Sequence, residues 1–423
     1  MNGPIHFSYD FHPVGQGLFA SGSIRKEHQT SWLFSWVYDC GSSFGKRFVE
    51  RELKRLADAN TPQKRIDLLT LSHFDHDHIS GVCDLLRQFA IDTLLLPFMP
   101  LGQRLQIAFE EGIDPGDALA GFFVNPVAFL LAIEGAEIRR ILFVPPSGNE
   151  GPPPIEGEPS APDEPDQPGD EPKLDFERGK PDDPREHNEL SQSSGSTLVE
   201  WLRPGARIAL RSFWEFVPYN DDAPAAPPSE WLSAIDNERT DLLSETSTDV
   251  RKEILSRLVD LYDSLFGRRS EQRNVISLFL YTGPIYPTWR VAILDPLSEP
   301  ILKRIADHPF VAHPAFSSKV PCSVLYSGDG YLDRRERLDR LITFLNPGRI
   351  ANVAAFQVMH HGAAGNWHDG VARAIRPLFS MFCSDPNRKR LGHPHAQVLR
   401  DFWQYGPLQV DKERFIQIPG VLL

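Results

Sequence analysis

A dense group of ionisable side chains occupies one short segment, Thr70 to Gly81, which reads TLSHFDHDHISG. Five of the six residues from His73 to His78 carry an imidazole or a carboxylate. These are the nitrogen and oxygen donors that divalent metal ions bind in proteins. A solvated polar turn favours Gly, Asn or Pro instead. The segment therefore predicts a metal site, and its chemistry points to hydrolysis.

The elements around this segment would hold it as a loop. An apolar strand is predicted over 65–71 and a helical stretch over 79–89. Such a loop can fold several side chains onto one centre without competing for the hydrogen bonds of a sheet. Other strands are expected at 5–11, 32–38, 93–96, 275–281, 289–294 and 323–326, with helices at 46–59, 332–345 and 396–403. This alternation indicates an α/β fold.

Six further short motifs occur along the chain. They are Val14-Gly15-Gln16-Gly17, Tyr38-Asp39-Cys40-Gly41, Asn274 to Ser277, Tyr326-Ser327-Gly328-Asp329, Met359-His360-His361-Gly362, and Asn387-Arg388 through Gly392-His393-Pro394-His395. In type and order they resemble the motifs of the metallo-β-lactamase superfamily, whose metal loop is HxHxDH. The HxDxDH form found here resembles the soluble nuclease-like domain of the competence protein ComEC. Met359 replaces a proline of that pattern, and residues 389–391 depart from it.

The resemblance implies a four-layer αββα fold with two divalent metal ions, Zn²⁺ or Mn²⁺. His73 and Asp75 would bind one ion, and Asp77 and His78 the other, with His76 at a variable position. Asp329 would bridge the ions and His393 would complete the second. Asp75, in place of the usual second histidine, makes the site harder and favours Mn²⁺ without excluding Zn²⁺.

The remaining motif residues would act on a substrate. Asp77, His360 and His361 are the predicted catalytic residues, the two histidines by contacting a phosphate or protonating the leaving oxygen. His395 could be a ligand, a supporting group or a phosphate contact. A histidine preceding Asp329, His308 or His313, is a further candidate ligand. The substrate-binding residues would be Arg388, Lys389, Arg390, His395, Asn274 and Ser277, the basic run offering a phosphodiester backbone three positive charges.

Length and composition fit a soluble enzyme. A chain of 423 residues has room for one large domain with insertions or for two domains. Its 4 cysteines show no paired spacing, which favours a reducing compartment. Neither a secretory leader nor a membrane span is visible, so we expect a cytoplasmic protein. Of the net charge of −13, the piece from 150 to 186 carries 13 acidic and 4 basic residues, so acidity elsewhere is small and does not argue against binding phosphate.

The acidic piece also divides the chain. It contains 10 prolines and few aromatic or β-branched residues, a composition typical of disorder. We expect the N-terminal half of a metallo-β-lactamase-like domain at 1–148, a linker at 149–187, a partly helical insertion at 188–270, and the C-terminal half at 271–423. The helical spacing at 228–266 could serve a protein partner.

Three functions fit these residues. The first is a metal-dependent phosphodiesterase, a nuclease acting on DNA through a metal-bound hydroxide. The second uses the same ions on a small phosphoester or cyclic nucleotide, because a fold does not fix a substrate. The third is a component of a multi-protein antiviral defence assembly, a role that relatives of this family allow. A long basic groove would favour a polymer and a closed pocket a small molecule.

Overall fold

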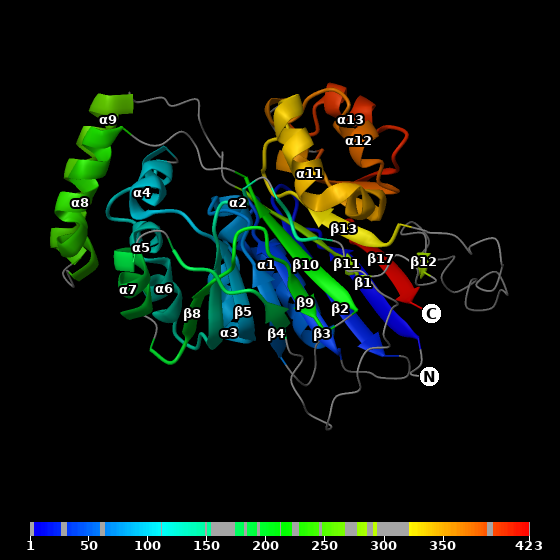
Figure 1. Cartoon of the computed structure of the whole chain (residues 1–423), viewed down its shortest axis with the longest axis horizontal. Coiled ribbons are helices and arrows are strands. Elements are labelled where there is room, and N and C mark those ends of the chain that lie inside the picture. The colour runs from blue at the N-terminus through cyan, green and yellow to red at the C-terminus, as the bar shows by residue number, and fades with distance from the viewer. Residues whose placement is uncertain are drawn as a thin grey trace.

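The computed structural model describes residues 4–26, 32–59, 64–110, 112–148, 150–153, 174–181, 184–192, 195–211, 213–221, 228–244, 248–266, 277–285, 291–293, 321–386 and 392–422. Two β-sheets pack face to face, and helices cover the outer face of each (Figure 1). This is the predicted αββα layering. Among the described helices, none combines the length and the apolar character that crossing a bilayer requires.

The first sheet contains the strand that leads into the metal loop. Its described strands, in spatial order, are β12 (Val291–Ile293), β17 (Ile416–Leu422), β1 (Ile5–Phe11), β2 (Phe19–Lys26), β3 (Phe34–Cys40), β4 (Arg65–Thr70), β5 (Ala90–Pro97), β6 (Ile138–Val144) and β8 (Leu198–Trp201). The strands from β3 to β8 run parallel, and those from β12 to β3 pair antiparallel.

The second sheet carries the other half of the predicted motifs. Its described strands, in spatial order, are β16 (Pro407–Val410), β15 (Phe379–Cys383), β14 (Val353–Gln357), β13 (Ser323–Tyr326), β11 (Leu278–Pro284), β10 (Trp214–Asn220), β9 (Ile208–Leu210) and β7 (Leu174–Phe176). The strands from β13 to β16 are parallel. Their carboxyl ends therefore lie along one edge of the sheet, where ligands bind in open α/β sheets.

Three apolar cores hold the four layers together. Between the sheets lie large aromatic side chains, including Tyr9, Trp36, Trp214 and Tyr326. The second core packs the first sheet against α1 (Lys46–Ala59), α3 (Val82–Gln88), α4 (Leu101–Glu110), α5 (Ala118–Val124), α6 (Pro126–Leu131), α8 (Ser229–Ser244) and α9 (Thr248–Phe266). The third packs the second sheet against α11 (Arg335–Ala351), α12 (Val371–Ile375) and α13 (Ala396–Phe402).

The segment 188–270, predicted as an insertion, is more closely built into the fold than we expected. It supplies β8 to the first sheet and β9 and β10 to the second, while its helical residues stand outside the sheets. β8 and β9 have 4 and 3 residues, too few for the alternating pattern that identifies a strand. The segment also begins within α7 (Pro184–Gln192). Residues 154–173 of the predicted linker lie outside the described residues.

A buried carboxyl group in β4 gives stability a testable pH dependence. Burial raises the pKa of Asp67 to about 6, although Arg65 and Ser35 oppose the rise. In the unfolded chain the pKa of an Asp is about 3.9. Between about pH 3.9 and pH 6 the folded chain therefore binds more protons than the unfolded chain, and the stability that the protonated Asp67 contributes is lost as the pH rises through 6. When the pH is raised from 4 to 7.5, the free energy of unfolding of Asp67→Asn should therefore rise by about 2–3 kcal/mol relative to that of wild type. Urea unfolding at several pH values measures this, and a difference that stays constant with pH would contradict it.

Candidate metal centre

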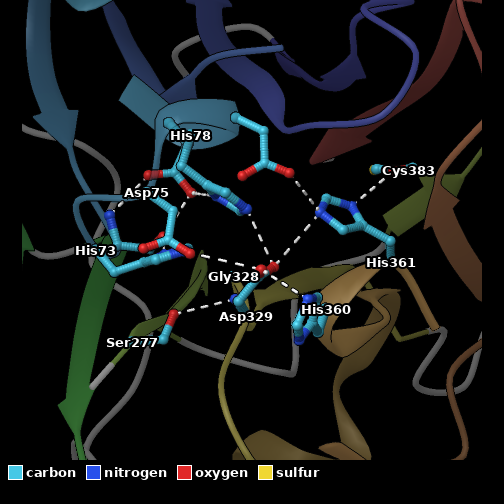
Figure 2. Close-up of polar contacts among 12 residues, drawn as sticks. His73, Asp75, His78, Ser277, Gly328, Asp329, His360, His361 and Cys383 are labelled. Atoms are coloured by element: carbon cyan, nitrogen blue, oxygen red, sulfur yellow. Dashed lines mark hydrogen bonds and ion pairs between the residues drawn. The ribbon is translucent and has the colours of Figure 1, made fainter. Parts of the chain in front are cut away.

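The predicted ligands meet where the two sheets present the ends of their strands. The loop after β4 supplies His73 to His78, the last three residues of which form α2 (His76–Ile79) together with Ile79. Asp329 follows β13, and His360 and His361 lie in the short helix η3 (Met359–Gly362) after β14. Figure 2 shows these side chains pointing toward one another from both sheets. Residues about 250 positions apart in sequence thus share one site.

Two glycines allow the metal loop to pack against the neighbouring turns. A Cβ atom on Gly41 would lie 2.5 Å from the carbonyl oxygen of Asp77, and one on Gly17 would lie 2.6 Å from the same atom. Gly17 also has a φ of +140°, which side chains other than glycine rarely adopt. That carbonyl accepts a hydrogen bond from the backbone N–H of Leu18 at 3.1 Å. The VGQG and DCG motifs therefore position the backbone of the metal loop.

Asp329 lies at the middle of the cluster and presents one oxygen to each side. Its Oδ1 is 3.0 Å from Nε2 of His78 and 3.7 Å from Nε2 of His361. Its Oδ2 is 3.5 Å from Nε2 of His360 and 3.8 Å from Nε2 of His73. A carboxylate placed in this way can span two ions about 3.5–4 Å apart.

Hydrogen bonds fix the ring orientation of the two histidines in the metal loop. His78 donates from Nδ1 to Oδ2 of Asp39 at 2.7 Å. Ser72 donates its one hydroxyl proton to Asp39 at 2.6 Å, so its oxygen must accept the bond from Nδ1 of His73 at 2.8 Å. Both rings therefore carry a proton on Nδ1 and, when neutral, direct the lone pair of Nε2 into the cluster.

The same reasoning applies to the two histidines of η3. Nδ1 of His361 bonds to the carbonyl oxygen of Cys383 at 2.7 Å, and a carbonyl can only accept. Asn366 donates from Nδ2 to the carbonyl oxygen of Asp329, so its Oδ1 accepts from Nδ1 of His360 at 2.9 Å. Four imidazoles thus direct Nε2 toward the same carboxylate.

This arrangement fits divalent cations. Nε2 of His73, Nε2 of His78 and Oδ1 of Asp329 are buried without a hydrogen-bond partner among the described residues. Neutral imidazole lone pairs and carboxylate oxygens that face one another repel unless a cation or protons lie between them. Each of these three unpartnered atoms is of a type that binds metal ions in proteins. Two candidate groups around Asp329 have ligand atoms within 4.8 Å of one another, His73, Asp75 and Asp329 in one and Asp77, His78 and His361 in the other.

The pKa shifts of Asp329 and His78 also indicate that the cluster stabilises positive charge. Burial would raise the pKa of Asp329, but the neighbouring His78, His360 and His361 hold that pKa well below its usual range. Burial likewise opposes protonation of His78, yet Asp329 and Asp39 raise the pKa of its ring well above the usual value. The carboxylates therefore stabilise positive charge at the centre of the cluster, which a metal ion would supply in place of protons.

The cluster is open to solvent on one side. The side chains of Asp77 and His360 are 22% and 29% exposed, whereas those of His78 and His361 are 0% and 1% exposed. His76, which the sequence analysis left without a role, is exposed at the start of α2. A substrate would therefore approach from the side of Asp77 and His360.

His361, and not His393, is grouped with the other two candidate ligands of the second ion. Its Nε2 is 3.2 Å from Oδ2 of Asp77, and it joins Asp77 and His78 in one candidate group. His393 belongs to none of the candidate groups found among the described residues, although its ring centroid is 5.3 Å from that of His360 and 6.4 Å from that of His361. His361 lies in η3, which directly follows β14, the strand beside the one that carries Asp329.

Two residues predicted to contact the substrate have hydrogen-bond partners within the chain. Ser277 is buried, and its hydroxyl accepts from the backbone N–H of Asp329 at 3.2 Å and donates to the carbonyl oxygen of Ser327. It supports the Asp329 loop. His395 is exposed, and its Nδ1 accepts from the backbone N–H of Ala364 at 3.1 Å. The residues Asn274, Arg388, Lys389, Arg390, His308 and His313 lie outside the described residues.

Two important residues were missing from the predicted site. Asp39, buried at the end of β3, joins a candidate group with His73 and His78, and Asn366 holds both His360 and Asp329. The DCG motif contained the signal for Asp39, an acidic residue at a strand end. The structure adds a second indication, which the sequence does not contain: Asp39, His360 and His361 have φ values of 55°, 44° and 56°. Such left-handed residues other than glycine cluster at functional sites.

Gly41→Ala tests the close packing behind the loop. The added Cβ would meet the backbone of Asp77 and His78 and displace both. We expect a 10-fold to 100-fold loss of metal affinity, about the size of effects from changing groups that support ligands. Gly365→Ala is the matched control, since a Cβ there meets nothing within 4 Å. Metal titration by calorimetry measures both, and equal affinities of the two variants would contradict the expectation.

Comparison with known proteins adds one finding. No protein-family model matches the chain, and no curated protein matches it. Among solved structures, the metallo-beta-lactamase fold protein YhfI from Bacillus subtilis matches with a TM-score of 0.35 and 10% sequence identity, over 98% of this chain and 99% of that one. A likeness at this level says nothing about what this chain binds or catalyses.

Proposed function

We propose that this chain is a metal-dependent hydrolase that cleaves phosphodiester bonds in nucleic acid, with DNA as its substrate, using two divalent ions such as Zn²⁺ or Mn²⁺. One observation carries the metal chemistry, the convergence of four imidazole Nε2 atoms on the two oxygens of Asp329. The substrate class comes from the resemblance of the HxDxDH loop to the nuclease-like domain of ComEC.

Two ions would be held by two sets of ligands. His73, Asp75 and Oδ2 of Asp329 would bind one ion, while Asp77, His78, His361 and Oδ1 of Asp329 would bind the other. Such ions supply Lewis acidity to a phosphoryl oxygen and lower the pKa of a bound water toward about 7. The ligand set contains imidazole and carboxylate only, which suits Zn²⁺ and Mn²⁺.

The exposed members of the cluster would act on the substrate. We assign His360 as the group that donates a proton to the leaving oxygen, because its ring faces the open side and Asn366 fixes its orientation. Asp77, on the same side and 3.2 Å from Nε2 of His361, would orient the attacking water as well as bind the second ion. His393, beside His360, would contact the phosphate.

The test is hydrolysis by the purified protein after metal analysis. Linear, circular and single-stranded DNA, RNA, and the small diester bis(p-nitrophenyl) phosphate are each incubated with Mn²⁺, Mg²⁺ or Zn²⁺. We expect cleavage of DNA that depends on added metal and stops with chelator. Cleavage of the small diester alone would replace the polymer with a small phosphoester as substrate. Absence of cleavage of every diester by protein that contains both ions would overturn the proposal.

A further inference from the structure

A basic cavity lies in the outer layer of the second sheet, lined by the first residue of α11 and by residues between 368 and 376. Its volume is about 240 Å³ and its walls include Arg335, His368, Asp369, Arg373 and Arg376. We call these five residues the arginine pocket. Three arginines and one aspartate line it, and the one aspartate cannot balance all three guanidinium charges. A concentration of positive charge that opposes the overall charge points to an anionic ligand.

Two of the arginines have no acidic partner. Arg335 forms an ion pair with Asp339 at 2.9 Å, but among the described residues no carboxylate pairs with Arg373 or Arg376. The single bond given to the Arg376 guanidinium goes to the carbonyl oxygen of Arg373 at 2.9 Å. Most of their N–H groups are therefore available to an oxyanion, which arginine binds in a bidentate manner.

A third polar group in the wall also lacks a partner. His368 donates from Nδ1 to the carbonyl oxygen of Asp369 at 2.7 Å, while its Nε2 is buried with no hydrogen-bond partner in the described part of the chain. Buried polar atoms are rarely left in that state. In the imidazolium form of His368 this nitrogen would donate to a phosphate oxygen bound in the pocket.

The pocket is connected to the metal centre by one short segment. Asn366 bonds to both His360 and Asp329, and Trp367 forms a β-bridge with Leu332. His368 follows directly, so its Cα atom lies within about 7 Å of that of Asn366. Figure 1 shows α11, which begins at Arg335, and α12, which contains Arg373 and is followed directly by Arg376, together in the outer layer above β13.

We propose that the arginine pocket binds a backbone phosphate of the nucleic acid, on the strand that continues past the phosphodiester at the metal centre. This inference rests on the proposed function and deepens it. A contact of this kind fixes position along the strand and carries no sequence preference. It would favour a polymer over a small diester, because a small diester has no second phosphate to reach the pocket.

The experiment measures binding without turnover. A fluorescently labelled oligonucleotide is titrated by polarisation in chelator, at several salt concentrations, with wild type and with Arg373→Ala/Arg376→Ala. The control pair Arg178→Ala/Arg257→Ala makes the same change of net charge at exposed positions elsewhere. We expect the pocket variant to bind about tenfold more weakly at low salt. Its salt dependence should fall by about 0.7–0.9 in slope for each lost phosphate contact.

The outcomes separate this inference from the proposed function. Equal affinity and equal salt dependence of the pocket variant and the control pair would overturn the pocket, whatever the protein hydrolyses. Failure of wild type to cleave any diester would instead remove the proposed function, and the binding comparison would still decide whether the pocket holds a phosphate. Thermal unfolding of all variants verifies folding, and Arg373→Lys/Arg376→Lys should recover part of the lost affinity.

Discussion

Asp329→Asn is expected to lower phosphodiester hydrolysis by at least about 1000-fold and to reduce bound metal from two ions to one or fewer. Asparagine keeps the size of the side chain but has one oxygen and no charge, so it cannot serve both sets of ligands. A bridged pair of ions contributes several kcal/mol to the transition state, and each 1.36 kcal/mol corresponds to tenfold in rate. Hydrolysis rates and elemental analysis of purified protein measure the two effects.

The matched control for this variant is Asp333→Asn. Asp333 lies four residues further along the chain and forms an ion pair with Arg337, outside the cluster. We expect it to retain both ions and nearly all activity, since Asp333 is in none of the candidate ligand groups found among the described residues and ion pairs near the surface contribute only about 1 kcal/mol to stability. Retention of both ions by Asp329→Asn would show that Asp329 does not bridge them.

His361→Ala and His393→Ala separate two assignments of the second ion. We expect His361→Ala to lose that ion and about 100-fold to 1000-fold in hydrolysis, because its Nε2 faces both Asp77 and Asp329. His393→Ala should retain both ions and lose about tenfold in hydrolysis, less than the roughly 100-fold or more that a proton-transfer group contributes. Metal content measured beside the rate distinguishes loss of a ligand from loss of a substrate contact.

Because His361 is buried, its removal also leaves a cavity, so unfolding in denaturant is measured for each variant. His361→Gln, which fills more of the space, provides a second version of the test. Loss of an ion from His393→Ala with full retention in both His361 variants would restore the assignment made from sequence.

The metal loop could be predicted because all of its information is local. Five donors in six positions between a strand and a helix leave few alternatives, and the loop joins the cluster as expected. Local sequence does not indicate whether His361 or His393 lies closer to the second ion. This depends on which strand lies beside β13 and on how far each histidine is from its strand end, and both are set by sheet order. The same limit applies to Ser277, whose burial behind Asp329 follows from the pairing of β11 with β13.

The helix expected over 79–89 shows a further limit of local patterns. In the structure α2 ends at Ile79, and the next helix, α3, begins only at Val82, after Ser80 and Gly81. A Cβ on Gly81 would lie 2.3 Å from Cγ1 of Val49 in α1, so the break depends on a tertiary contact. Apolar spacing alone cannot indicate such a contact.

The division of the candidate ligands between two sheets has a consequence for the molecule as a whole. The loop after β4 belongs to the first sheet, and Asp329 and η3 belong to the second, so bound ions would act as non-covalent cross-links between layers that apolar packing otherwise joins. When the free ion concentration is 100 times the dissociation constant, each occupied site adds about 2.7 kcal/mol to the free energy of unfolding. Separating the layers and releasing the ions would then be a single event, and metal supply would set how long the folded enzyme survives.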